Sequence, residues 1–161
     1  ETLQLQTVQQ QTSLSQSEEV LSFASLGAEE EEIEQVFAQQ ERILADEQAQ
    51  PQIQAVLEQV EMSEQNVVKV ASRRAAVIEE KLEELAREGK NVEELEILLA
   101  DAQSKIEEAS TLLHTIREDV RAEDANEATI HATRDTFRAA RKNTRDVYEA
   151  FRSIARESKN L

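Results

Sequence analysis

Two pairs of histidine and glutamate are the residues whose types and spacing best suit metal chemistry. His114 precedes Glu118 by four residues, so these two side chains share one face of a helix. Glu127 precedes His131 by the same interval, and a hairpin turning near residue 123 would bring both pairs level. Two imidazoles and two carboxylates can hold zinc or another divalent metal. The alternative is four surface residues, because Glu118 falls near an outward heptad position and the E-x-x-H spacing of di-iron bundles is absent.

A second pattern is a stripe of arginines near the C-terminal end of an acidic chain. Residues 134–156 hold six arginines and one lysine, whereas residues 1–66 hold fourteen acids and one base, and the formal net charge is −16. A seven-residue apolar repeat over 130–154 places the bases beside the buried seam of one helix. The arginine stripe consists of Arg134, Arg138, Arg141, Arg145 and Arg152.

The arginine stripe has two interpretations. It could bind an anion such as nucleic acid, a phospholipid headgroup or another polyanion, or it could pair with acids of a neighbouring helix or subunit. Because the large negative net charge repels a polyanion, we expect charge pairing, with a protein partner or a second copy and no nucleic acid.

The acidic run EEEEIE at 29–34 resembles a cation-binding cluster in composition. Consecutive residues of a helix point about 100° apart, so only acids three or four positions apart converge. Acids are also favoured in the first turn of a helix by its dipole. We therefore expect a solvated face here and no calcium site, since no D-x-D-x-D-G loop occurs.

Catalytic motifs are missing from the sequence. It has no serine nucleophile elbow, no glycine-rich phosphate loop and no H-E-x-x-H motif, and it contains only 2 glycines for mobile loops. We expect a protein without enzymatic activity and without a cofactor.

The elements that position these residues are predicted to be helices. The chain has 161 residues with 2 Gly, 1 Pro and no Cys, and it is rich in Ala, Glu, Gln, Leu and Arg, which favour helix. No apolar run approaches the roughly 18 residues of a membrane span. The absence of cysteine excludes disulfides and thiol chemistry.

Apolar residues at intervals of three and four predict an elongated, antiparallel, all-α bundle. Three long helices should follow one or two shorter N-terminal ones, and the links at 89–91 and 123–126 are short enough to force antiparallel neighbours. Gly27 is predicted to be a turn, and a weak internal similarity at a shift of 62 residues aligns it with Gly89. The expected helices cover 15–26, 28–50, 52–88, 91–120 and 124–161.

The opening of the chain differs in composition from the rest. Residues 1–14 are rich in Gln, Ser and Thr, with Leu3, Leu5 and Val8 as their apolar residues before Leu14. We treat 1–14 as a polar segment ahead of a single bundle domain at 15–161. Its three leading apolar side chains are candidates for an anchor between subunits.

The segment IEEKLEELAREGKNVEELEILLADAQSKIEEA, residues 78–109, ends a helix at Gly and starts a Leu/Ala heptad after a short polar link. It resembles a helical hairpin found in uncharacterised exported proteins of archaea and little-studied bacterial lineages, and the likeness extends over about residues 70–158. The resemblance implies an extracytoplasmic bundle and no particular activity.

These observations favour a structural or interaction protein. We expect an exported acidic bundle, extracellular or periplasmic, that self-associates or docks an envelope partner. The start at Glu1 instead of Met fits either processing on export or a shortened chain, and we favour export. The alternative is a ligand-binding periplasmic-type module that responds to divalent metal or acts like a chaperone.

Overall fold

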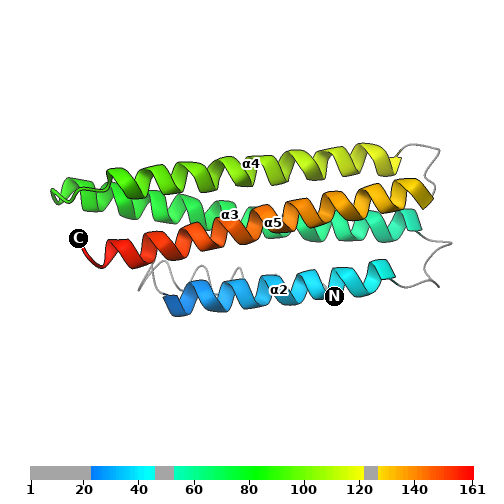
Figure 1. Ribbon diagram of the computed structural model, residues 1–161, viewed down its shortest axis with the longest axis horizontal. Coiled ribbons are helices and arrows are strands. Elements are labelled where there is room, and N and C mark those ends of the chain that lie inside the picture. Colours follow the sequence, from blue (N-terminus) through cyan, green and yellow to red (C-terminus); the bar gives the residue numbers. More distant parts are fainter. Residues whose placement is uncertain (1–22, 46–52, 122–126) are drawn as a thin grey trace.

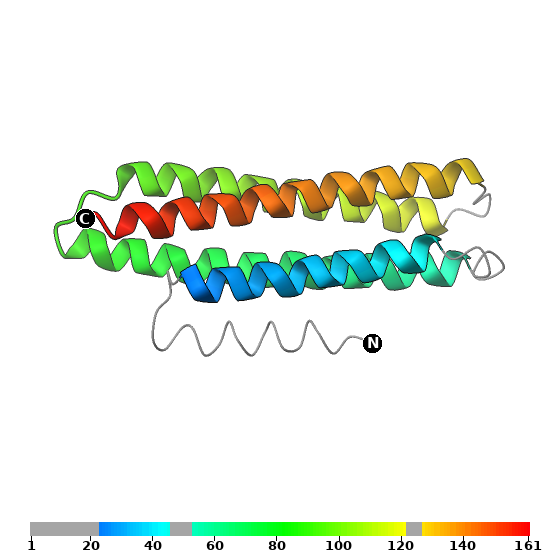
Figure 2. The ribbon, with the colours of Figure 1, turned by 60° about the horizontal axis from the view of Figure 1, so that its bottom comes forward.

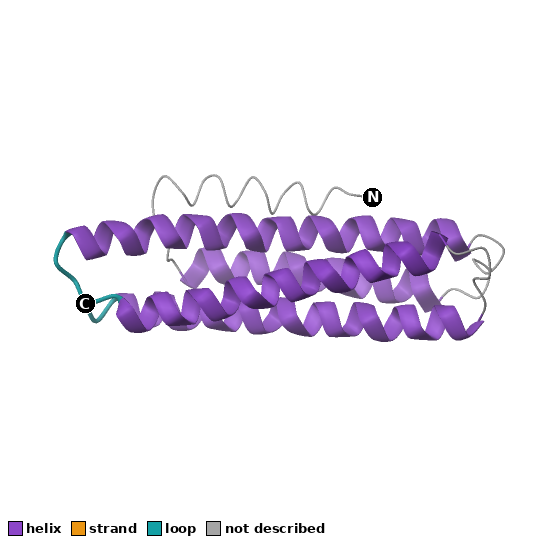
Figure 3. Ribbon diagram, turned by 90° about the horizontal axis from the view of Figure 1, so that it is seen from above, coloured by secondary structure: helices purple, strands orange, loops and turns teal. Residues whose placement is uncertain are grey.

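The structure, a computed structural model, describes residues 23–45, 53–121 and 127–161, apart from a few side chains at helix ends. These residues form four helices, and none of them lies in a strand (Figures 1 and 3). The helices are α2 (Phe23–Ala45), α3 (Ile53–Arg87), α4 (Glu93–Arg121) and α5 (Glu127–Ser158). The predicted all-α bundle is therefore confirmed.

Successive helices run in opposite directions along the bundle and lie side by side (Figures 1 and 2). Each helix is antiparallel to the next in sequence, and α5 returns beside α2 to close the ring. The α4–α5 and α3–α4 contacts are the most extensive, while α2 meets its two neighbours more sparsely. With 35 residues, α3 is roughly 52 Å long at 1.5 Å per residue, so the bundle is elongated.

The link between α3 and α4 is built from standard helix-ending and helix-starting contacts. Gly89 has a φ of 87°, which favours glycine, and its N–H donates to the Ala86 carbonyl at 3.0 Å. The N–H of Lys90 donates to the Leu85 carbonyl at 3.0 Å, completing a Schellman motif. Asn91 then caps α4 by accepting a hydrogen bond from the backbone N–H of Glu93 at 3.2 Å.

The apolar core is divided into two clusters along the bundle. The cluster nearer the α3–α4 link includes Leu26, Ile33, Phe37, Val67, Ile78, Leu82, Leu99, Val147 and Phe151. The other cluster includes Leu44, Leu57, Val60, Ala109, Leu113, Ile116, Phe137 and Ala140. On three helices a buried polar residue stands between them in sequence: Gln40, Glu64 and Arg141. We call these three residues the central polar layer.

The prediction of a turn at Gly27 is wrong, because α2 begins at Phe23 and runs through this residue to Ala45. A glycine inside a helix costs only about 0.5–1 kcal/mol relative to alanine. Leu26 and Glu29, on either side of Gly27, are both fully buried. The inward face of α2 therefore continues past Gly27. The contacts made by this buried face outweigh the conformational cost of a glycine in the helix. The expected helix at 15–26 lies outside the described residues, apart from its last four.

None of the described helices combines the length and the apolar character that crossing a membrane requires.

Candidate functional site

The arginine stripe of α5 faces the acids of α2. The Nε atom of Arg145 lies 2.7 Å from Oε1 of Glu34, and its Nη2 atom lies 3.0 Å from Oε2, so this ion pair is bidentate. One heptad further along α5, Nη1 of Arg152 lies 3.2 Å from Oε1 of Glu30. Partial burial raises the pKa of Glu30, an effect that Arg152 opposes. Both pairs keep α2 in one register along α5.

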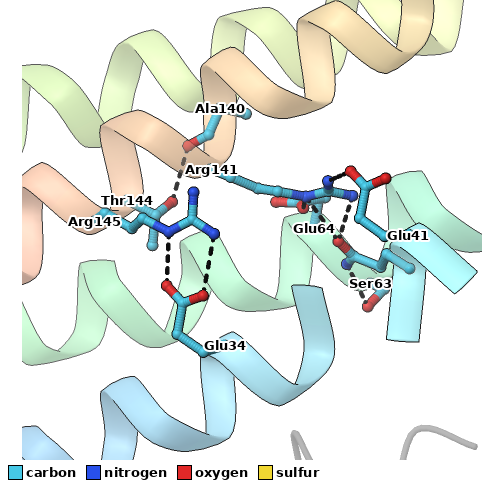
Figure 4. A network of polar contacts seen from close by, with 9 residues as sticks. Glu34, Glu41, Ser63, Glu64, Ala140, Arg141, Thr144 and Arg145 are labelled. Carbon is cyan, nitrogen blue, oxygen red and sulfur yellow. Dashed lines mark hydrogen bonds and ion pairs between the residues drawn. The ribbon is translucent and has the colours of Figure 1, made fainter. Parts of the chain in front are cut away.

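Arg141 is the buried member of the stripe, and its guanidinium joins three helices (Figure 4). Its Nε donates to Oε1 of Glu64 on α3 at 3.0 Å, and its Nη2 donates to Oε1 of Gln40 on α2 at 3.0 Å. Its Nη1 also pairs with Glu41 of α2. The guanidinium carbon lies 5.6 Å from the centre of the Phe37 ring, close enough for a cation–π contact.

Glu64 is the acid of the central polar layer, and it is completely buried. Its Oε1 accepts from Arg141, whereas its Oε2 has no hydrogen-bond partner among the described residues. Burial raises the pKa of Glu64 to about 7, although Arg141 acts in the opposite direction. Glu64 can therefore take up or release a proton near neutral pH.

The other two stripe residues make different contacts. Arg134 donates from Nη2 to the backbone carbonyl of Leu44, which lies in the last turn of α2. Arg138 is exposed, and its Nη1 lies 3.6 Å from Oδ1 of Asp135 on the same helix. The structure thus brings Arg134, Arg141, Arg145 and Arg152 against α2 and leaves Arg138 at the surface.

A second buried ion pair lies inside the first apolar cluster. Nη2 of Arg74 lies 2.8 Å from Oε2 of Glu29, and both side chains are fully buried. The same Nη2 donates to the hydroxyl of Ser25 at 3.1 Å, and the hydroxyl of Tyr148 donates to Oε1 of Glu29. Burial and the neighbouring Glu29 carboxylate raise the pKa of Tyr148 well above its ordinary value.

The expectation of a solvated face at 29–34 is wrong for Glu29. This run also lies beyond the first turn of α2, since the helix begins at Phe23, so the helix dipole does not account for its acids. Glu29, Glu30 and Glu34 instead meet cationic side chains of α3 and α5. Charge pairing within the chain thus accounts for three of the five acids in this run.

Sequence reasoning missed the roles of Glu64 and Arg74. The available signal was position: each charged residue falls on the apolar face of α3, Glu64 between Val60 and Val67 and Arg74 between Val70 and Ile78. A charged residue at a core position requires a buried partner. The pattern thus shows that a partner exists but does not identify it.

An open pocket of about 360 Å³ lies between α2 and α5. The lining of the pocket is mixed in charge and comprises Glu34, Phe37, Ala38, Glu41, Arg138, Arg141 and Arg145. Glu41 already neutralises Arg141, and Glu34 already neutralises Arg145. An anion that enters the pocket would therefore have to displace these carboxylates from the arginines.

The outward side of α4 is a separate feature. All the acids of this helix are exposed, namely Glu93, Glu94, Glu96, Asp101, Glu107, Glu108, Glu118 and Asp119. The two described bases of α4 are engaged, Lys105 with Asp101 at 3.2 Å and Arg117 with Glu61 of α3 at 3.1 Å. Ile97, with 63% of its surface exposed, lies within about one turn of Glu93, Glu94, Glu96 and Asp101. We call this surface, the eight acids with Ile97, the α4 acidic face.

The histidines lie at the opposite end of the bundle from the α3–α4 link. His114, Glu118 and His131 are all exposed, and the side chain of Glu127 lies outside the described part of the structure. No group of three or more metal-ligating side chains gathers anywhere in the described residues. The four-residue metal site, which requires Glu127, stays a prediction.

The proposed subunit anchor, Leu3, Leu5 and Val8, lies outside the described residues. No protein-family model, curated protein or solved structure matches the chain.

Proposed function

We propose that the protein is a non-enzymatic interaction module, exported from the cell, that docks a positively charged partner protein on the α4 acidic face. One observation carries the proposal: α4 presents a row of eight exposed carboxylates, and four of them, on Glu93, Glu94, Glu96 and Asp101, lie within about one turn of a large exposed aliphatic side chain, Ile97. Such an arrangement matches a common form of protein interface, an apolar anchor within a charged rim.

The distribution of charge favours a partner over a second copy on this face. The bases of α5 that could attract carboxylates are largely engaged with α2, as shown by Arg141, Arg145 and Arg152. The formal net charge of −16 makes the approach of two acidic faces repulsive at low salt. The complementary surface therefore belongs to a molecule with a basic patch.

The α4 acidic face can be tested with matched variants. The first carries Glu94→Gln, Ile97→Ser and Asp101→Asn. The control carries Glu79→Gln, Met62→Ser and Glu83→Gln on α3, which removes the same charge and an aliphatic side chain that is also 63% exposed. Each variant and the parent are immobilised and exposed to the envelope and secreted fractions of the source cells.

We expect a basic protein to be retained by the parent and the α3 control, to be lost with the α4 variant, and to elute with salt. Retention of the same proteins by all three chains, or of none by the parent, would exclude specific docking on α4.

A further inference from the structure

We propose that α2 is an exchangeable helix, and that the surface of α3 and α5 on which it lies also accepts α2 of a second copy of this chain. The reciprocal exchange would join two copies into a dimer. This inference concerns the side of the bundle formed by α2, α3 and α5, so it does not depend on the α4 acidic face.

The connectivity permits the exchange. Within the described part of the chain, α2 is joined to the other helices through a single segment, 46–52. Seven residues reach up to roughly 25 Å when extended. The helices α3, α4 and α5 follow one another through their own links and make the two most extensive contacts of the bundle. Three helices thus keep each other in place whichever copy supplies α2.

The nature of the α2 contacts favours release. Two of its ion pairs with α5 are partly exposed: Glu34 with Arg145, at 50% and 53% exposure, and Glu30 with Arg152, at 21% and 44%. Exposed ion pairs are individually weak and are screened by salt. The sparse contacts of α2 with its neighbours act in the same direction. Of the four helices, α2 is therefore the one with the least contact to hold it, although its apolar face and Glu29 are buried against the other three.

The same contacts specify what can occupy the vacated surface. An incoming helix must carry acids that match Arg145 and Arg152, an acid for the fully buried Arg74, and apolar side chains for the first core cluster. The α2 helix of a second copy supplies all of these in the same register. Exchange between copies therefore recreates every native contact without a new interface, which is the physical basis of domain swapping.

Charge reversal in separate chains gives a direct test. One variant carries Glu30→Arg and Glu34→Arg in α2, and the other carries Arg145→Glu and Arg152→Glu in α5. In each variant alone, whether monomeric or self-paired, like charges face each other across the α2–α5 contact. Only a dimer formed from one chain of each kind, with both α2 helices exchanged, restores all four attractive pairs.

We expect each variant alone to sediment near the monomer mass of 18.2 kDa, and an equimolar mixture to sediment at twice that mass. The mixed dimer should form at a concentration about tenfold or more below any self-association of either variant. Helicity, measured by circular dichroism, should rise on mixing, because repulsion displaces α2 in the separate chains and the mixed dimer restores its contacts.

The control combines all four substitutions in one chain, which restores the pairs within the molecule. It should behave as the parent and form no mixed dimer with either single-side variant beyond the parent level. A mixture of the two variants that stays monomeric at all concentrations would overturn the inference, and so would variants that remain unfolded on mixing. Repeating the mixture with the α4 substitutions separates this result from the docking proposal, because exchange should be unchanged by them.

Discussion

The contact between α4 and α5 and the contact between α2 and α5 use different chemistry, although both are antiparallel helix pairs in one bundle. The first is an apolar seam in which buried Leu, Ile, Ala and Phe side chains repeat at intervals of three and four. The second carries a row of acids on α2 opposite a row of arginines on α5. The bundle thus combines a three-helix unit with a fourth helix that adds directional, charged contacts to its share of the apolar core.

Apolar seams and buried ion pairs have different effects, the first mainly on the stability of the bundle and the second on the alignment of its helices. Apolar seams supply most of the free energy of folding but tolerate sliding by a heptad, because one Leu resembles the next. Buried ion pairs contribute less net free energy, yet a shift of α2 would separate Glu29 from Arg74 and Gln40 from Arg141. We interpret Arg74 and Arg141 as the residues that set the register of α2.

The largest expected effect comes from truncating the apolar seam. Phe151 is fully buried, so Phe151→Ala should lower the free energy of unfolding by about 4 kcal/mol through lost burial and a new cavity. Phe23 of α2 is 36% exposed, and Phe23→Ala should cost less than about 1 kcal/mol. Urea denaturation of the two variants measures the contrast. Equal losses would contradict the larger contribution of the buried seam.

Removing the cation of the buried ion pair should have the next largest effect. Arg74→Met leaves the carboxylate of Glu29 buried without its charge partner, and we expect a loss of about 3 kcal/mol. Its neighbour Arg73 is exposed, so Arg73→Met is a matched control that should change stability by less than about 0.5 kcal/mol. If both variants unfold at the parent's urea midpoint, the buried pair has no role in holding α2.

The proton equilibrium of Glu64 should make the central polar layer sensitive to pH. Because the folded pKa of Glu64 is raised from 4.5 to about 7, the folded protein holds a proton that the unfolded chain has released between these pH values. The resulting contribution to stability is complete below pH 4.5 and is lost as the pH rises to about 7. Each unit of pKa corresponds to about 1.4 kcal/mol, so the loss is on the order of 3 kcal/mol.

Glu64→Gln should remove this component of the pH dependence. We expect the difference in unfolding free energy between the parent and Glu64→Gln to shift against the parent as the pH rises from 4.5 to 7. Glu58→Gln, an exposed position on the same helix, should follow the parent's profile. A constant difference between the parent and Glu64→Gln across this range would show that Glu64 does not titrate there.

The exposed ion pair between Glu34 and Arg145 should contribute little on its own. Arg145→Ala is expected to lower stability by about 1 kcal/mol or less, since both side chains are half exposed. The loss should shrink further in 0.5 M salt, where the charges are screened over a few ångströms. A loss that is large and independent of salt would indicate that this pair is part of the core.

The last expected contrast is between alanine substitutions at the two glycines, which should change stability in opposite directions. A methyl group on Gly27 would meet no atom within 4 Å, and the residue lies inside α2, so Gly27→Ala should stabilise the protein by about 0.5–1 kcal/mol. Gly89 has a φ of 87°, so Gly89→Ala should destabilise by a similar or larger amount. Thermal melts of the two variants should therefore shift in opposite directions.

Local sequence patterns were sufficient to predict the helices that pack through apolar seams. The spacing of Leu95, Leu99, Ala102 and Ile106 marks the buried face of α4, and Gly89 with Asn91 marks the start of that helix. The same reasoning failed at Gly27, where a local cost near 1 kcal/mol was outweighed by burial of Leu26 and Glu29. Apolar periodicity indicates which face of a helix is buried, and the structure confirms the buried faces predicted in this way.

The charged contacts were only partly predictable. The heptad placed the arginines of α5 along one side of a helix, but the acids they meet lie about a hundred residues away in sequence, as with Arg145 and Glu34. Nothing local identifies such a partner. The burial of Glu64 and Glu29 is likewise set by arginines on other helices, so it emerges only when the helices are assembled.

Native-state hydrogen exchange tests the central claim most directly, because it reports the opening free energy of each helix in the unmodified protein. We expect the amides of α2 to exchange at a lower opening free energy than those buried in α4 and α5. Adding salt should widen this gap, because two exposed ion pairs join α2 to α5 whereas α4 is joined to α3 by Arg117 and Glu61 and otherwise by apolar contacts. If α2 and α4 instead open together, with one free energy and one salt dependence, the division into a three-helix unit and a separately held fourth helix is contradicted.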